Sequence, residues 1–217
     1  MSLNKNLSLL HKEVLESLSP DVRKQLINEE KKLFNNYLEG KTLKVGSQVP
    51  NVFFRDENLK SVYLTDLLKE HHLVLSFFRG TWCPYCNLEL ISLAKINNEI
   101  EKRGARLVAV SPELNRYSED TLKKNKIDFP VFTDLNNKAA DEFGLVFNLS
   151  PEYREIYQTL NIHLNILNSE NNWTLPMPAT FIISKDGVIT STYVNADYTQ
   201  RMEPNDILEQ LDLLSRS

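Results

Sequence analysis

The chain lacks the features that mark several classes of protein. No apolar run approaches the ~18 residues of a membrane-spanning helix, and the first residues lack the apolar core of an export signal, so we expect a cytoplasmic protein away from membranes. The net charge is −4 and Lys and Arg are scattered among acids, which disfavours nucleic acid as a partner. No G-x-G-x-x-G segment or P-loop occurs, so we expect no nucleotide cofactor.

Cysteine is scarce, with two in 217 residues, and both lie in Trp82-Cys83-Pro84-Tyr85-Cys86. A zinc site needs about four ligands, and none of the four histidines stands at ligand spacing from the pair, so we expect no metal. A structural disulfide across two residues would remove little entropy from the unfolded chain. Two inert buried cysteines remain an alternative, but the spacing favours a redox-active dithiol.

The position of the pair along the chain supports this interpretation. An apolar run over 73–78 predicts a buried strand, a Gly80-Thr81 turn follows it, and Pro84 is suited to the first turn of a helix. Both sulfurs would then lie near a helix N-terminus, where unpaired N–H groups and the positive end of the helix dipole stabilise a thiolate. In a reducing cytosol such a dithiol cycles between its two oxidation states.

Residues 1–40 are predicted to form an N-terminal helical hairpin, separate from a domain over 41–217. Apolar residues recur at helical spacing over 3–39, with a break at Ser19-Pro20-Asp21 and a stop at Gly40. This segment carries no chemical motif. We therefore interpret it as an arm for packing or for homodimer formation.

The remainder alternates between strand and helix patterns, which predicts an α/β sandwich with a mixed sheet. The segment 148–175 is irregular and is interpreted as an insertion over one face, with a helix near 152–160. Predicted strands cover 52–55, 61–64, 73–79, 105–110, 129–132, 178–184 and 188–194. Predicted helices run from a Thr65 or Asp66 cap to near His71, over 84–103, onward from a Ser118 cap, over 139–143 and over 204–211.

These motifs, in this order, resemble the peroxiredoxin-like branch of the alkyl hydroperoxide reductase/thiol-specific antioxidant family, in the thioredoxin-like superfamily. The resemblance covers about 41–215. It depends on Val45-Gly46 with Pro50 and Phe53, on the segment 77–90 around the cysteines, and on 178–183 before Asp186-Gly187. It implies a thioredoxin-like fold, with a mixed β-sheet flanked by helices and an N-terminal helical extension.

The resemblance assigns the catalytic positions in two different ways. On the peroxiredoxin pattern Cys86 occupies the peroxidatic position, Cys83 replaces a Thr, Arg79 replaces a Pro, and Pro178 replaces an Arg. On the thioredoxin pattern Cys83 attacks, Trp82 precedes it, and Pro178 either forms a cis peptide bond facing the dithiol or is an ordinary trans proline that opens a strand. The frame therefore resembles a peroxiredoxin, whereas the catalytic residues resemble a thioredoxin.

The neighbouring residues have predicted supporting roles. Arg79 is the nearest cation to either thiolate, although it could also end the strand in water. The resemblance makes Pro84 and Tyr85 tuners of the dithiol. Trp82 either shields the dithiol or packs. We expect Glu89 on a solvated helix face rather than in a proton relay, and Trp173 in core or lid packing.

We therefore expect a thioredoxin-dependent, peroxiredoxin-like oxidoreductase. It would act as an antioxidant peroxidase on hydrogen peroxide or organic hydroperoxides, cycling through a Cys83–Cys86 disulfide that a thioredoxin- or glutaredoxin-type dithiol reduces. We expect Cys86 to be the peroxidatic residue. A protein disulfide reductase is the alternative, favoured by the missing Arg at Pro178. Another is a redox-sensing interaction module that switches the contacts of the N-terminal arm.

Overall fold

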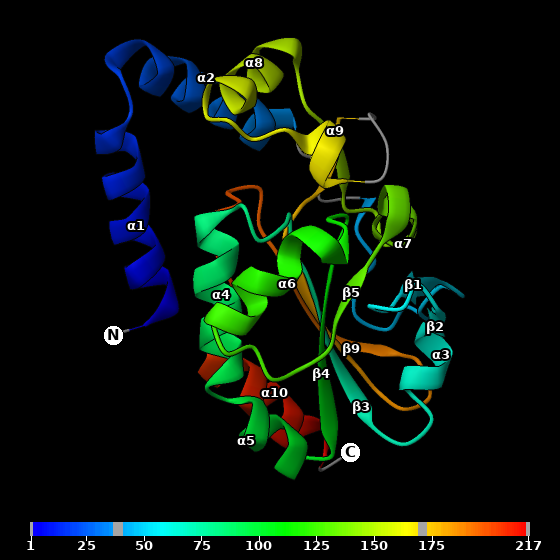
Figure 1. Cartoon of the computed structure of the whole chain (residues 1–217). Coiled ribbons are helices and arrows are strands. Elements are labelled where there is room, and N and C mark those ends of the chain that lie inside the picture. Colours follow the sequence, from blue (N-terminus) through cyan, green and yellow to red (C-terminus); the bar gives the residue numbers. More distant parts are fainter. Residues whose placement is uncertain (1, 37–40, 169–172, 216–217) are drawn as a thin grey trace.

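The computed structural model describes residues 2–36, 41–168 and 173–215. A seven-stranded sheet with the order β2-β1-β5-β4-β3-β8-β9 lies at the centre, and helices flank it (Figure 1). The sheet is mixed, because β3 pairs in parallel with β4 and antiparallel with β8. Its strands are β1 (Phe53–Arg55), β2 (Ser61–Tyr63), β3 (His72–Phe77), β4 (Ala105–Ser111), β5 (Val131–Thr133), β8 (Ala179–Ile183) and β9 (Ile189–Val194).

Every strand predicted from the sequence is present, with ends shifted by at most two residues. The central strand β3 is buried along most of its length, because its alternate side chains enter two separate cores. Val74 joins the core that also holds both cysteines, whereas Leu73 and Leu75 join the core on the other side. Both faces of the sheet are therefore covered, as the apolar run predicted.

The helices divide between these two faces. Figure 1 shows α4, α5 and α10 on one side of the sheet and α3 on the other. Their bounds are α1 (Leu3–Ser17), α2 (Pro20–Asn36), α3 (Leu64–Leu67), α4 (Pro84–Ala94), α5 (Asn97–Lys102), α6 (Asn115–Lys124), α7 (Lys138–Glu142), α8 (Pro151–Thr159), α9 (Leu164–Leu167) and α10 (Pro204–Leu214), with a 3₁₀ turn over Leu135–Asn137.

Three predicted helices differ from the observed ones. The helix predicted over 84–103 is divided into α4 and α5, because Ile96 leaves the helical conformation (φ −110°, ψ 2°). The helix α3 is short and ends at Leu67. Ser118 does not cap α6, which begins at Asn115; Ser118 is buried inside the helix and its hydroxyl donates to the Asn115 carbonyl (3.2 Å).

The two predicted N-terminal helices are present, and they pack on different parts of the domain. Helix α1 packs against α4, whereas α2 packs against α8, so the two helices diverge (Figure 1). Leu3, Leu7 and Leu26 enter the core that contains the cysteines, which gives each helix its own place on the domain. The predicted stop at Gly40 lies outside the described residues, and the domain boundary there stays a prediction. The described part of the chain contains no helix long and apolar enough to cross a membrane.

The predicted insertion is framed by a two-stranded ribbon that the sequence did not indicate. Strands β6 (Val146–Asn148) and β7 (Thr174–Pro176) pair antiparallel at its base. Trp173 packs partly buried against the core that contains the cysteines, as expected. Ser150, at the start of α8, donates to Glu29 of α2 (2.5 Å), which attaches the insertion to the N-terminal helices.

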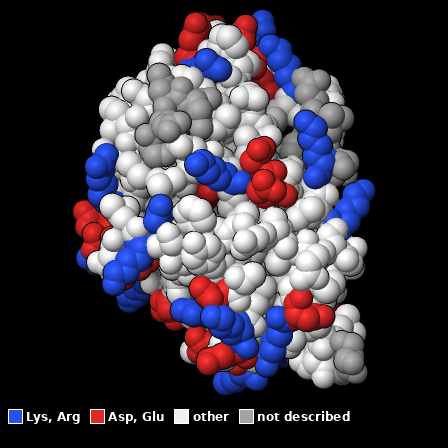
Figure 2. Space-filling model, turned by 90° about the vertical axis from the view of Figure 1, so that its right-hand side faces the viewer, with Lys and Arg blue, Asp and Glu red and all other residues white. Residues whose placement is uncertain are grey.

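The surface carries both signs of charge. On the face shown in Figure 2, basic and acidic side chains are interspersed rather than gathered into a single patch. This pattern agrees with the scattered charges of the sequence.

Candidate active site

A tight turn between β3 and α4 places the cysteines. Gly80 has φ +147°, and a Cβ there would lie 2.2 Å from the indole Nε1 of Trp82, so this turn requires a glycine. Cys83 donates its backbone N–H to the Gly80 carbonyl (3.2 Å) and occupies the N-cap of α4 in an extended conformation. Cys86 follows in the first turn of the helix. The prediction that Pro84 begins this helix is confirmed.

Both cysteines are free thiols with no exposed surface. Their sulfurs lie inside one core together with side chains from α1, α2, α8 and the segment after β9. Among the described residues no cluster of His, Cys, Asp or Glu is arranged to hold a metal ion. The chemistry of the site therefore depends on the groups that surround the two sulfurs.

Arg79 is the principal charged neighbour of Cys83. Its Nη2 donates to Cys83 Sγ (2.9 Å), and its Nη1 donates to the Tyr157 hydroxyl (3.0 Å). The side chain is buried rather than lying in water at the end of the strand. Arg79, the cation nearest to the cysteines in the sequence, is thus hydrogen-bonded to Cys83 in the structure.

The two cysteines differ sharply in acidity. Burial opposes ionisation of Cys83, but a hydrogen bond from Cys86 and the positive charges of Arg79 and Arg201 outweigh it and lower the pKa of Cys83 to about 5. Burial raises the pKa of the Cys86 thiol well above its usual value, and donation to Cys83 raises it further. At neutral pH the site therefore holds a Cys83 thiolate beside a protonated Cys86.

A second arginine, which the sequence did not indicate, lies beside Cys86. Arg201 Nη2 donates to Cys86 Sγ (3.7 Å), and its Nε donates to Glu89 Oε2 (2.5 Å). The prediction of a solvated Glu89 is wrong, because this carboxyl is buried. Burial raises the pKa of Glu89 to about 7 against the attraction of Arg201. Arg201 is missed because a lone arginine in a loop, far along the chain, carries no motif.

Thr81 holds the turn between β3 and α4 through hydrogen bonds to Glu113. Its backbone N–H and hydroxyl both donate to Glu113 Oε2 (2.7 and 2.8 Å). The Asn87 side chain donates to the Thr81 carbonyl (2.7 Å). Burial raises the pKa of Glu113, and the contacts of this carboxyl with Thr81 hold the turn in place. Glu113 was not foreseen, because it joins the site from the end of a neighbouring strand.

Aromatic side chains enclose the dithiol. Trp82 meets the edge of Tyr157 (ring centroids 5.4 Å apart), so it packs over the turn. Tyr85 is buried against Tyr198 (5.7 Å), and its hydroxyl is hydrogen-bonded to Nδ1 of His11 on α1 (2.9 Å). Tyr85, one of the two residues between the cysteines, therefore contacts helix α1.

Pro178 follows the trans alternative rather than the cis one. No cis peptide bond occurs in the described ranges, so the bond after Met177 is trans. Met177 donates its N–H to the Leu145 carbonyl (2.8 Å), and the chain continues extended from β7 into β8. Pro178 is buried beside the active-site turn, because the next residue, Ala179, pairs with Phe77.

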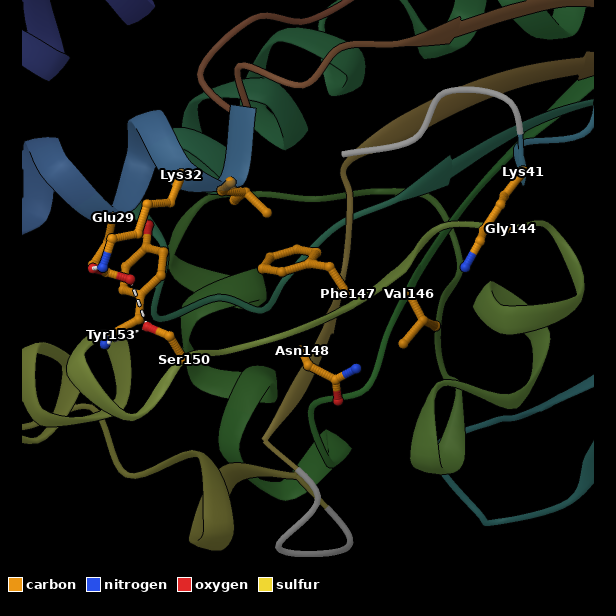
Figure 3. Close-up of a pocket in the computed structure, with 10 residues that line it drawn as sticks. Glu29, Lys32, Lys41, Gly144, Val146, Phe147, Asn148, Ser150 and Tyr153 are labelled. Carbon is orange, nitrogen blue, oxygen red and sulfur yellow. Dashed lines mark hydrogen bonds and ion pairs between the residues drawn. The ribbon is translucent and has the colours of Figure 1, made fainter. Parts of the chain in front are cut away.

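Figure 3 shows a cavity of about 300 Å³ whose lining is separate from the two cysteines. It opens between α2 and the segment from β6 to α8, with Glu29 and Ser150 joined by their hydrogen bond on one side. Its lining, within the described part of the chain, includes neither cysteine. Tyr153 forms part of its wall and meets the edge of Tyr157 (5.1 Å), so the aromatic cluster separates the cavity from Arg79.

Comparison with known proteins agrees with this geometry. The model of the AhpC/TSA family matches residues 45–192. The chain is 25% identical to a 1-Cys peroxiredoxin of Dictyostelium discoideum, covering 73% of this chain and 78% of that protein. It is 27% identical to the thiol-disulfide oxidoreductase ResA of Geobacillus thermodenitrificans, covering 79% and 84%.

A solved structure supports the fold. A yeast mitochondrial 1-Cys peroxiredoxin, described with a thiol resolving mechanism via glutathione/thioredoxin systems, superposes with a TM-score of 0.60 at 19% identity, covering 81% of this chain and 78% of that one. The thioredoxin-like fold predicted from the sequence is therefore confirmed. A family match over most of the chain, together with a buried dithiol at the N-terminus of α4, makes the chain a peroxiredoxin-like member of the AhpC/TSA family, a thiol-dependent oxidoreductase.

Proposed function

We propose that the chain reduces peroxides and that Cys83, not Cys86, is the attacking residue. The observation that carries the proposal is the 2.9 Å hydrogen bond from Arg79 to Cys83 Sγ at the N-cap of α4. A guanidinium and the helix N-terminus both stabilise the thiolate, which is the nucleophilic form. The peroxiredoxin pattern assigned this role to Cys86, whose pKa is raised by burial.

The cycle has two chemical steps. The Cys83 thiolate attacks one peroxide oxygen, the O–O bond breaks, and the other oxygen leaves as water or an alcohol after taking a proton, so that Cys83 becomes a sulfenic acid. Cys86 then loses its proton and attacks the Cys83 sulfur, which expels hydroxide and forms the disulfide. Arg201, at 3.7 Å from Cys86 Sγ, stabilises the Cys86 thiolate that this second step needs.

Burial of the sulfurs favours a small oxidant over a protein substrate. Neither cysteine has any exposed surface, so the covering groups must move to admit any reactant, and they must move less for a peroxide than for a folded protein disulfide or a protein reductant. A protein disulfide reductase is the second candidate, favoured by the C-x-x-C pair and by the similarity to ResA. Turnover of a protein disulfide such as insulin distinguishes the two activities.

The reductant, compartment and assembly complete the proposal. A thioredoxin- or glutaredoxin-type dithiol would reduce the Cys83–Cys86 disulfide, and the similar yeast structure is described with glutathione/thioredoxin systems. A cycling dithiol suits the reducing cytoplasm. A homodimer remains a prediction. Helices α1 and α2 pack on the domain of their own chain, and this packing does not itself supply a contact between two copies.

The test is stopped-flow Trp fluorescence of the reduced protein mixed with hydrogen peroxide. We expect Cys86→Ser to keep a phase far faster than a free thiol and to stop at the sulfenic acid, whereas Cys83→Ser loses that phase. If Cys83→Ser alone keeps it, Cys86 is peroxidatic. If neither variant nor the wild type exceeds a free thiol, peroxide is not the substrate.

A further inference from the structure

Arg79 has a neighbour that the chemical steps above do not use. Its Cζ lies 3.9 Å from the centroid of the Tyr198 ring, a contact that is strong for a cation in a buried site. Tyr198 belongs to the segment between β9 and α10 and is itself buried. The Tyr198 ring therefore packs against the Arg79 guanidinium and limits its movement.

The N-terminal helices determine how that ring is held. The Tyr198 hydroxyl donates to Glu30 Oε1 on α2, and the Tyr198 ring meets the edge of Tyr85. Nε2 of His11 on α1 lies 4.0 Å from Glu30 Oε2. Nδ1 of the same ring is hydrogen-bonded to the Tyr85 hydroxyl (2.9 Å). The phenol is thus held at its hydroxyl by Glu30 and at its ring by Tyr85.

Helix α1 is in turn anchored beside the second arginine. The backbone N–H groups of Leu3 and Asn4 donate to the Glu203 carboxylate (2.8 Å each). The Asn4 side chain donates to the Arg201 carbonyl (2.8 Å) and accepts from the Arg201 N–H (2.9 Å). Both N-terminal helices are therefore hydrogen-bonded to the segment that carries Tyr198 and Arg201.

We infer that Glu30 and Tyr198 are positioning residues and that the N-terminal helices complete the active site by holding the Arg79 guanidinium on Cys83. The charged and titratable groups that face Cys83, among the described residues, are Arg79, Cys86, Arg201, Tyr85 and Tyr157. Tyr198 and Glu30 act through Arg79 and touch no reacting atom. The inference deepens the proposed function but concerns the ionisation of Cys83, so it can be tested without peroxide.

The experiment measures the rate at which iodoacetamide modifies Cys83, located by peptide mass spectrometry, between pH 4 and pH 9. The ratio of the rates at pH 5 and pH 9 reports ionisation, because any change in exposure affects both rates alike. We expect Tyr198→Leu to move the midpoint of the profile upward by about one pH unit. A midpoint one unit above the wild-type value of about 5 makes the reaction about fivefold slower at pH 5 relative to pH 9.

Two variants at position 30 form the matched pair. Glu30→Ala and Glu30→Gln both remove the negative charge, but only Gln keeps an oxygen that can accept from the Tyr198 hydroxyl. We expect the midpoint for Glu30→Ala to exceed that for Glu30→Gln. Glu29→Ala, which removes the neighbouring contact to Ser150, is the control for disturbance of α2 and leaves the midpoint unchanged.

The inference is overturned if Glu30→Ala and Glu30→Gln share one midpoint, since Tyr198 and Glu30 would then only pack. A lower melting temperature without a shifted profile overturns it as well. If Tyr198→Leu fails to fold, the pair at position 30 decides. Failure of the peroxidase proposal appears separately, as slow reaction with hydrogen peroxide alongside an intact pH profile.

Discussion

Replacing Arg79 by Met should make Cys83 a weaker acid. The substitution keeps an unbranched aliphatic stem but removes the charge and the donor 2.9 Å from Cys83 Sγ. A hydrogen bond to a charged group contributes about 1.5–3 kcal/mol, and one pKa unit corresponds to about 1.4 kcal/mol. The expected rise is therefore about one to two units above the wild-type pKa of about 5.

The predicted loss of reactivity depends on pH. At pH 6 about nine-tenths of the wild-type Cys83 is thiolate, given a pKa of about 5, and the variant would fall to between about a half and a tenth. Alkylation at pH 6 should slow by about two- to tenfold, whereas the rates at pH 9 should nearly coincide. The assay is iodoacetamide modification across this range, with circular dichroism to confirm folding.

The same change affects stability in a definite direction. A thiol whose pKa is lowered by folding stabilises the protein at high pH, and this contribution is lost as pH falls through the folded pKa. The wild-type free energy of unfolding should therefore gain more between pH 5 and pH 9 than that of Arg79→Met, as measured in urea. Arg103→Met, which removes a surface pairing with Asp212, is the control. If the midpoint of the alkylation pH profile of Arg79→Met stays near the wild-type value, the role of Arg79 is refuted.

Two further predictions concern the surroundings of the dithiol. Folding raises the Glu89 pKa from 4.5 to about 7 and so favours the protonated form. The wild type should therefore lose about 3 kcal/mol of stability as the pH rises from about 4.5 to 7. Glu89→Gln should abolish this loss. Equal pH slopes of urea unfolding for wild type and variant would contradict this. Gly80→Ala should lower the melting temperature more than Gly104→Ala and shift Trp fluorescence. Both glycines have positive φ, but only the Cβ at position 80 would meet the indole. Equal decreases in melting temperature for Gly80→Ala and Gly104→Ala would rule out a clash with the indole as the cause.

Local patterns were sufficient to predict the frame of the site. The apolar run of β3, the Gly80 turn and Pro84 each act through neighbours in the chain, so the placement of both cysteines at the start of α4 could be read from the sequence. Arg79 was also within reach, because it is four residues from Cys83 and follows the strand directly. Its burial could not be foreseen, since the covering rings come from distant segments.

Other residues were misjudged because helical periodicity describes one helix and not what covers it. Glu89 was expected in solvent, but Arg201, 112 residues later, covers it and supplies the opposite charge. Tyr85 was recognised only as a neighbour of the sulfurs, whereas its hydroxyl reaches His11 on α1. The ribbon of β6 and β7 escaped notice because the two strands pair across the whole insertion, so no local turn signal joins them.

The sequence alone determined that this protein carries one dithiol, at the beginning of a helix that follows a buried strand, because spacing and apolar patterning are local properties. The tertiary structure decided which sulfur is the thiolate. That choice depends on charges brought together by folding: Arg79 contacts Cys83, Arg201 lies beside Cys86, and Glu30 of an N-terminal helix holds the ring that packs on Arg79. Coulombic and hydrogen-bonding interactions depend on distances in space, and only the folded chain sets those distances.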